Sequence, residues 1–98
     1  MGAIKSNNYT QREQDLFLIA RAFAHPARIR IMKMLHSGMG LRNVDLSVEL
    51  NLSKKTIKEH VDMIKDAKLI RIDYFMHYYL ISLNSDGLEK AAYILKME

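Results

Sequence analysis

The stretch from Val44 to Leu69 has the pattern of two short helices joined by a tight turn. Asn43 is suited to cap the first helix, because its side-chain oxygen can accept a hydrogen bond from a free backbone N–H. We predict that this helix ends at Asn51-Leu52 and that Ser53 caps the second helix. The apolar residues of the first helix are Val44, Leu46, Val48 and Leu50. In the second helix, apolar residues recur at the i, i+4, i+7 spacing of one buried stripe, which comprises Ile57, Val61 and Ile64.

The second helix carries its lysines away from that stripe, at Lys54, Lys55, Lys58 and Lys65. Two helices with this pattern are typical of a helix-turn-helix, whose second helix enters the DNA major groove. We therefore expect residues 53–68 to form the recognition helix. Its N-terminus offers partial positive charge and free N–H groups to a phosphate, and the Ser53 and Thr56 hydroxyls can add hydrogen bonds.

The acidic residues of this helix leave two interpretations open. Glu59 and Asp62 lie on its exposed side, where a carboxylate can accept a hydrogen bond from cytosine N4. In the other interpretation Asp62 forms an i, i+4 ion pair with Lys58, and Asp66 faces solvent.

Histidine and arginine residues around the helix pair are equally open. His60, beside the buried stripe, either binds a phosphate or packs the helix against its neighbour. Arg28 and Arg30 lie in the preceding helix, where they can contact the DNA backbone. A salt bridge from either of them to Asp45 or Glu49 is an equal alternative.

Residues 1–9 are polar and lack periodicity, so we expect a flexible end. A capping box of Thr10 and Glu13 then starts a helix over residues 10–24. One side of this helix carries Leu16, Ile19, Ala20 and Phe23, while Phe17 and Leu18 lie off that stripe. A helix that is apolar on two sides needs two partners. We take the second side as a contact with another subunit.

Pro26 discourages helical geometry at His25 and suits the first position of a new helix, which we predict over Pro26 to Ser37 with Gly38 at its end. The expected core residues of this helix are Ile31, Met32 and Leu35. A brief extended segment over residues 39–41 leads into the helix pair.

After Lys68 the period becomes that of strands, over Leu69–Tyr74 and Tyr78–Leu83. A hairpin beside a helix-turn-helix forms a wing. Ser85 or Asp86 then caps a final helix, residues 85–97, whose apolar positions are Leu88, Ala91, Ala92 and Leu95, widened by Tyr93 and Ile94. The wing is rich in aromatic residues. Either Tyr74, Tyr78 and Tyr79 pack onto the core, or the wing contacts DNA or a protein.

The bulk properties exclude several classes of function. The chain has 98 residues, a net charge of +4 and no cysteine, so thiolate metal sites and disulfides are absent. We find no phosphate loop, nucleophile elbow, histidine ligand spacing, signal peptide or membrane span. We expect one cytoplasmic domain over residues 1–98 that is not an enzyme and binds neither metal nor cofactor.

The order and spacing of these segments resemble the ArsR-type winged-helix transcriptional regulators. The most specific parts are the helix start His25-Pro26-Ala27-Arg28 and the frame that contains Ser53, Thr56, Ile57, His60, Val61, Ile64 and Leu69. The resemblance implies a mainly α (α+β) winged helix-turn-helix, with about five helices and a two-stranded hairpin. It also implies a homodimer in which the first and last helices pair across a two-fold axis.

The chain departs from the family pattern in ways that affect function. Where metal-sensing members carry a cysteine motif, this chain has Val44-Asp45-Leu46-Ser47, and its last helix has Asp86 and Glu89 but no histidine. The usual glycine before the first wing strand is Lys68. The wing tip, residues 74–78, lacks the arginines that usually contact phosphate. We therefore expect no metal sensing.

These features predict a homodimeric repressor that binds double-stranded DNA at a pseudo-palindromic operator. The expected DNA-binding residues are Ser53, Lys54, Lys55, Thr56, Lys58, Glu59, His60 and Arg28. The expected dimer interface comprises Leu16, Phe17, Phe23, Leu88, Ala92 and Leu95. The alternative is a winged-helix module for protein–protein interaction that uses the aromatic wing, because Glu59, Asp62 and Asp66 dilute the positive charge of the recognition helix.

Overall fold

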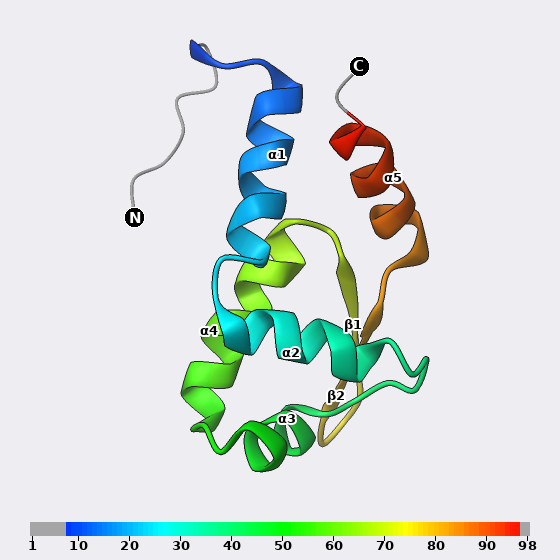
Figure 1. The fold of residues 1–98 in the computed structure, drawn as a ribbon. Helices are drawn as coiled ribbons and strands as arrows, with labels where there is room; N and C mark the ends of the chain where they lie inside the picture. Colours follow the sequence, from blue (N-terminus) through cyan, green and yellow to red (C-terminus); the bar gives the residue numbers. More distant parts are fainter. Residues whose placement is uncertain (1–7, 97–98) are drawn as a thin grey trace.

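Five helices and a two-stranded sheet make up residues 8–96, the part of the chain that this computed structural model describes (Figure 1). The helices are α1 (Gln11–Ala22), α2 (Pro26–Leu35), α3 (Asn43–Leu50), α4 (Lys54–Asp66) and α5 (Ser85–Leu95). The strands are β1 (Ile70–Tyr74) and β2 (Tyr79–Leu83). This order confirms the predicted winged helix-turn-helix of the mainly α class. Most of the predicted flexible end, residues 1–7, lies outside the described residues.

Side chains at the start of α1 and α2 determine where these helices begin. Thr10 Oγ1 accepts a hydrogen bond from the Glu13 N–H at 3.1 Å, and Glu13 Oε1 accepts one from the Thr10 N–H at 2.9 Å. This confirms the predicted capping box. At the start of α2, His25 Nδ1 accepts a hydrogen bond from the Ala27 N–H at 3.0 Å, and Pro26 occupies the first helical position.

Both helices end two residues earlier than the sequence predicts, at Ala22 and Leu35. The next residues form tighter hydrogen bonds to carbonyls three positions back. The Phe23 N–H donates to Ala20 O at 3.2 Å, and the Gly38 N–H donates to Leu35 O at 3.1 Å. Such bonds satisfy the last carbonyls of a helix without continuing it.

Two predicted helix caps are wrong. The residue that caps α3 is Arg42, whose N–H donates to Asp45 Oδ2 at 2.8 Å, and Asn43 is already inside the helix. The residue that precedes α5 is Asn84, whereas Ser85 is its first helical residue. In both cases the structure uses an asparagine side chain for a contact with a distant segment, which the local pattern does not reveal.

The turn between α3 and α4 follows the prediction. Asn51 ends α3 in the left-handed conformation, with φ of 53°, a conformation that asparagine adopts more readily than most residues. Ser53 then caps α4, because its Oγ accepts a hydrogen bond from the Thr56 N–H at 3.1 Å. Side chains within the turn itself therefore determine where the recognition helix begins.

The core lies where α1, α2 and α4 meet the base of the wing, and its fully buried side chains include Ile31, Leu35, Leu46, Ile57, Val61, Ile64, Leu69 and Ile81. The predicted stripe of α4 is thus confirmed. Three positions differ from expectation. Ala20 and Ala92 are exposed. Val48 is also exposed, to 76%, because alternate residues of the helix α3 do not share one helix face. Ala22 is completely buried instead.

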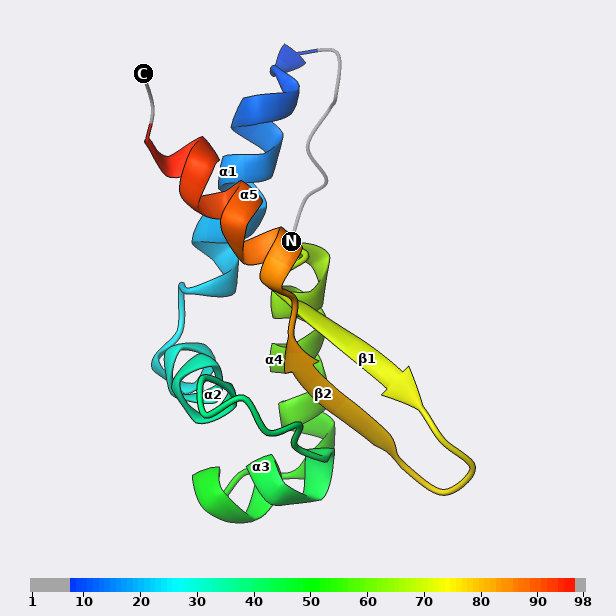
Figure 2. The ribbon, with the colours of Figure 1, turned by 90° about the vertical axis from the view of Figure 1, so that its right-hand side faces the viewer.

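The wing is an antiparallel hairpin that projects away from the helices (Figure 2). Ile72 pairs with Ile81 and Tyr74 with Tyr79. Leu41 adds an isolated bridge to Ile81, with N···O distances of 2.9 and 2.8 Å, as the predicted extended segment requires. No helix among residues 8–96 has the length and hydrophobicity needed to cross a membrane.

The base of the wing and the start of α5 approach each other so closely that only glycine fits at position 87. A Cβ atom on Gly87 would lie 1.6 Å from the backbone oxygen of Lys68. Lys68 itself has a φ of 63°, a left-handed conformation that favours glycine. The Asn84 side chain donates to the same Lys68 oxygen at 3.0 Å.

Candidate nucleic-acid interface

The first turns of α4 present an exposed polar and basic surface. Ser53 Oγ lies 3.0 Å from Thr56 Oγ1, so the two hydroxyls form one polar cluster at the N-terminus of the helix. Lys54, Lys55 and Glu59 are exposed, and no ion pair joins them to another residue within 8–96. The predicted stripe lies on the opposite side of α4, where it is buried. Burial of the apolar side against the core turns the polar side of the N-terminal half of α4 toward solvent.

Lys58 and Asp62 form the predicted i, i+4 ion pair, with a distance of 2.9 Å between Nζ and Oδ2. The hydrogen bond to Asp62 and the negative charge of Asp62 raise the pKa of Lys58 above its ordinary value. Both side chains remain substantially exposed, so the pair is screened by water and weak. Asp66 faces solvent as predicted, and its Oδ2 also lies 2.8 Å from Nη2 of Arg21 in α1.

His60 packs against α2 and does not belong to the exposed face of α4. Only 9% of it is exposed, and its ring centroid lies 4.5 Å from that of His25. Its Nδ1 lies 3.5 Å from Nη1 of Arg28. Burial lowers the pKa of His60, and the nearby His25 and Arg28 lower it further. Of the two roles that the sequence leaves open, the structure places His60 in the packing role.

Arg28 supports this contact between α2 and α4. It is half-buried, and burial, followed by the charge of Arg21, lowers its pKa. Neither Arg28 nor Arg30 forms the alternative salt bridge to Asp45 or Glu49, because the Asp45 partner within residues 8–96 is Arg42, at 3.6 Å. The predicted contact of Arg28 with the DNA backbone therefore competes with its position beside His60.

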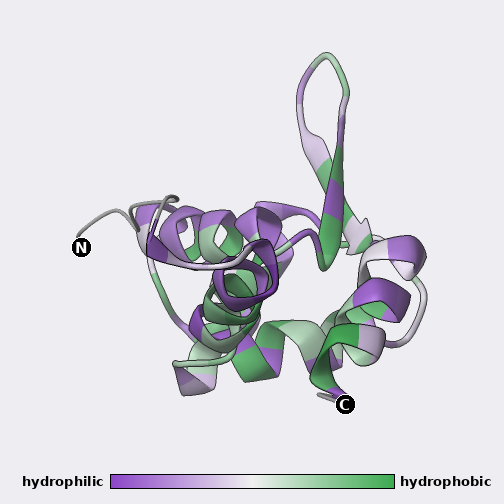
Figure 3. Ribbon diagram, turned by 90° about the horizontal axis from the view of Figure 1, so that it is seen from above, coloured by the Kyte–Doolittle hydropathy of each residue, from purple (hydrophilic) through white to green (hydrophobic). Residues whose placement is uncertain are grey.

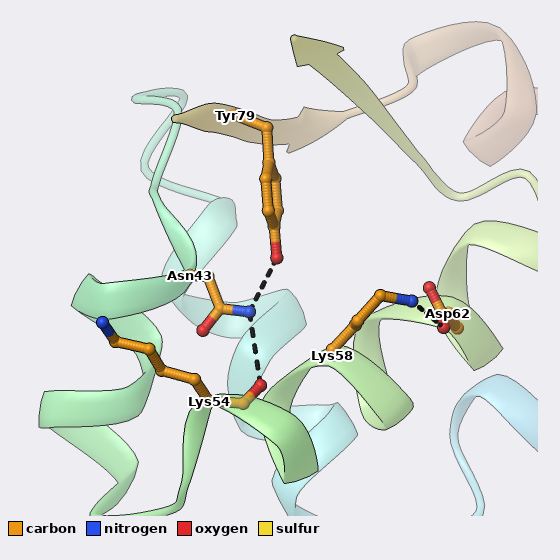
Figure 4. A network of polar contacts seen from close by, with 5 residues as sticks. All are labelled: Asn43, Lys54, Lys58, Asp62 and Tyr79. Carbon is orange, nitrogen blue, oxygen red and sulfur yellow. Dashed lines mark hydrogen bonds and ion pairs between the residues drawn. The ribbon is translucent and has the colours of Figure 1, made fainter. Parts of the chain in front are cut away.

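A cleft of about 280 Å³ separates the start of α3 and α4 from the wing, and it is lined by Arg42, Asn43, Val44, Lys54, His77, Tyr78 and Tyr79. Asn43 bridges its two sides (Figure 4). Its Nδ2 donates to Tyr79 Oη at 2.7 Å and lies 3.5 Å from the backbone oxygen of Lys54. Sequence reasoning misses this site, because the local pattern assigns Asn43 to the cap of the helix and does not pair it with Tyr79.

The tip of the wing is exposed and carries no arginine. Met76 is 91% exposed and Tyr74 is 71% exposed, while the rings of Phe75 and Tyr78 stack with centroids 4.9 Å apart. The prediction that the wing tyrosines pack onto the core is correct for Tyr79 alone, which is half-buried against it.

The opposite end of the molecule is formed by α1 and α5, where apolar residues remain uncovered. Leu95 is 54% exposed, Tyr93 is 68% exposed and Phe23 is 40% exposed. Figure 3 views this end from above and shows hydrophobic residues gathered toward the C-terminal half of α5. Arg12 Nη2 donates to the backbone oxygen of Ile94 at 2.9 Å and so fixes α1 to the end of α5.

The residues predicted for a dimer interface divide into two groups. Phe23, Ala92 and Leu95 are exposed. Leu16 and Leu88 are half-buried and pack against the core of this chain, and the Phe17 ring carries the guanidinium of Arg21 at 5.7 Å from its centroid. Only the first group is available in full to another molecule.

Within residues 8–96, no group of three histidine, cysteine, aspartate or glutamate side chains is placed to hold a metal ion.

Residues 25–71 match the family described as bacterial regulatory protein, arsR family. Over these residues the chain is similar to the ArsR family. The matched residues begin at the cap of α2 and end in β1, so they contain the whole helix-turn-helix. No curated protein matches the chain closely enough to count as a relative.

Several solved structures have the same fold. An ArsR family transcriptional regulator is 17% identical with a TM-score of 0.76, and the match covers 90% of each chain. HlyU from Vibrio cholerae N16961 is 20% identical with a TM-score of 0.70, over 89% of this chain and 94% of HlyU. NolR from Sinorhizobium fredii is 18% identical with a TM-score of 0.69, over 97% of this chain and 93% of NolR.

Proposed function

We propose that this chain, as one domain over residues 1–98, is a homodimeric transcriptional repressor that binds a pseudo-palindromic DNA operator through α4. The observation that carries the proposal is the start of α4, where Lys54 and Lys55 are exposed without an ion pair beside the Ser53 and Thr56 hydroxyls. In a helix-turn-helix, this part of the recognition helix meets the DNA.

In this proposal, the lysines neutralise backbone phosphates and supply affinity that depends on salt. Base reading falls to exposed side chains of the same turns, of which Glu59 is the acceptor suited to cytosine. The residues that contact DNA directly are Ser53, Lys54, Lys55, Thr56, Lys58 and Glu59. His60 and Arg28 hold α4 against α2 and contribute indirectly.

The exposed apolar residues of α1 and α5 support the dimer. Two copies of α4 would then occupy successive major grooves about 34 Å apart on one face of the DNA. A protein that binds the chromosome acts where the chromosome lies, so we propose a cytoplasmic location. The proposal assigns no catalysis and no resident metal to the chain.

The test is binding of a random-sequence DNA duplex, followed by fluorescence anisotropy at several salt concentrations. We expect the logarithm of affinity to fall linearly with the logarithm of salt concentration. The double substitution Lys55→Ala and Lys58→Ala should weaken binding about 10-fold or more. It should also reduce the slope by about 0.9 for each phosphate that a lysine no longer neutralises.

The matched control is Lys33→Ala with Lys65→Ala, which removes the same charge away from the start of α4. Equal affinities of the two double variants would refute the role of α4.

The exposed wing tip favours one alternative, a module that binds another protein through Phe75 and Met76. Alanine at both positions distinguishes the two functions. Under the repressor proposal the double variant keeps most of its affinity for DNA, whereas under the alternative it loses its protein partner.

A further inference from the structure

The orientation of the Asn43 amide determines the direction of the hydrogen bond between Asn43 and Tyr79. The backbone oxygen of Lys54 lies 3.5 Å from one amide atom of Asn43, and a carbonyl oxygen can only accept a hydrogen bond. In the structure this atom is the N–H donor Nδ2. Nδ2 also lies 2.7 Å from Tyr79 Oη, so the tyrosine oxygen is the acceptor in this bond.

The hydroxyl proton of Tyr79 is consequently free. A phenol has one proton to donate, and its oxygen already accepts the hydrogen bond from Asn43. Within residues 8–96, the Tyr79 hydroxyl has no other hydrogen-bond partner. Figure 4 shows this hydroxyl directed from β2 toward Asn43 and the N-terminal end of α4.

The surroundings of this hydroxyl suit an anion. The cleft beside it is lined by Arg42, Lys54 and His77, and none of its lining residues is a carboxylate. One of the lining residues, Arg42, is paired with Asp45.

The cleft lies between the two elements that flank the DNA backbone when a recognition helix occupies a major groove. We propose that Tyr79 Oη donates a hydrogen bond to a DNA backbone phosphate held in this cleft, and that Asn43 is the positioning residue that directs the hydroxyl toward it. Tyr79 thereby supplies from the base of the wing the phosphate contact that the tip, without arginine, does not. The inference rests on the proposed binding of DNA by α4.

The decisive variant is Tyr79→Phe, which keeps the ring and removes only the hydroxyl. A hydrogen bond to a charged group is strong enough that its loss should weaken binding of the random-sequence duplex about 10-fold. The slope against salt should stay unchanged, because a neutral donor releases no counterion. This separates the Tyr79 hydroxyl from the lysines, whose removal reduces the slope. The control is Tyr9→Phe, an exposed tyrosine just before α1, which should bind as the original chain does.

A second variant separates direct contact from an effect on structure. In Asn43→Ala the hydroxyl loses its guide, so affinity should fall by a smaller factor, and adding Tyr79→Phe should weaken binding further. If the double variant binds no more weakly than Asn43→Ala alone, Tyr79 acts only by holding Asn43, and the phosphate contact is refuted. Thermal unfolding of each variant establishes that the fraction folded at the assay temperature is the same.

The outcomes also distinguish this inference from the function on which it rests. If the original chain fails to bind DNA at low salt, both fail. If it binds and Tyr79→Phe binds equally well, the phosphate contact alone is wrong. Inorganic phosphate without DNA, titrated at constant ionic strength, should give no saturable change in tyrosine fluorescence. A saturable change that Tyr79→Phe abolishes, with DNA affinity intact, would assign the cleft to a free phosphate instead.

Discussion

The two ends of the molecule expose different kinds of side chain, polar and basic at one end and apolar at the other. At one end, α3, α4 and the wing present lysines, hydroxyls and a tyrosine that hydrogen bonds hold in place. At the other, α1 and α5 leave side chains such as Leu95 and Tyr93 open to solvent. Contacts of the first kind weaken with salt, whereas contacts of the second kind depend on the concentration of the protein itself.

The difference between the two exposed surfaces follows from which side of each helix is buried in the core. In α4 the core takes Ile57, Val61 and Ile64, so the polar side is left free. In α5 the core takes Ala91 and Ile94, which leaves an apolar side uncovered. The same rule of burial therefore leaves a polar, lysine-bearing surface at one end and an apolar surface at the other.

The largest expected effect concerns the joint between the two ends. Gly87→Ala places a methyl group on the backbone oxygen of Lys68, so the start of α5 must shift away from the wing. We expect a loss of about 3 kcal/mol in the free energy of unfolding, measured in urea. Gly38→Ala is the control. It has nothing within 4 Å of the added Cβ, and its φ of 88° alone costs about 1–2 kcal/mol. Equal losses would show that the two ends are not tightly joined at Gly87.

A charge on the apolar end should have the next largest effect. Leu95→Glu introduces a carboxylate on the exposed side of α5, which a dimer interface would have to desolvate. We expect the dimer dissociation constant to rise about 100-fold, which sedimentation at several protein concentrations would measure, with helicity unchanged. Val48→Glu is the matched control, because Val48 is 76% exposed at the opposite end. Dissociation by Val48→Glu and not by Leu95→Glu would reverse the assignment of the two ends.

The sequence predicts well those features that local physical rules decide. The capping box at Thr10, the cap at Ser53 and the stripe on α4 are all correct, because each depends on residues within one turn or on one period. The wing strands also lie where the change of period places them. The family resemblance rests on these segments, and the match over residues 25–71 confirms it.

Features that depend on distant contacts do not follow from the local pattern. The pattern predicts Asn43 as the cap of α3, but its amide is used by Tyr79, which lies in another element. It predicts correctly that Asp66 faces solvent, but it does not predict the ion pair of Asp66 with Arg21 of α1. The burial of Ala22 and the exposure of Val48 depend on how α1 and α3 rotate against the core. Spacing along the chain reveals none of these, because the partner is chosen by packing.

A smaller change sharpens the polar end. Asp62→Asn removes the acid that holds Lys58 at 2.9 Å and also removes a negative charge that repels phosphate. We expect affinity for a random-sequence duplex to rise about 5-fold, with a slope against salt that is steeper by up to about 0.9, because Lys58 becomes free to release a counterion. Asp86→Asn makes the same change in net charge at the start of α5 and should leave both quantities unchanged. An equal gain in the two variants would attribute the effect to net charge alone.

The smallest effect concerns the support beneath the polar end. His60 has a lowered pKa in the folded chain, so the unfolded chain binds its proton more readily. The stability that neutral His60 contributes is present above its unfolded pKa of about 6.5 and is lost as the pH falls toward the lower folded value. Among the neighbours of His60, Arg28 and His25 disfavour its charged form, while Glu59 favours it.

We therefore expect the midpoint of thermal unfolding to fall between pH 7.5 and pH 5.5, and to fall less in His60→Gln, which carries no titrating ring. The matched control is His77→Gln on the exposed wing, which should show the pH dependence of the original chain. A dependence that persists unchanged in His60→Gln would mean that another group carries it. Loss of the pH dependence in His60→Gln alone would show that neutral His60 stabilises the buried side of α4. The side chains on the exposed side of α4 would remain able to change ionic partners.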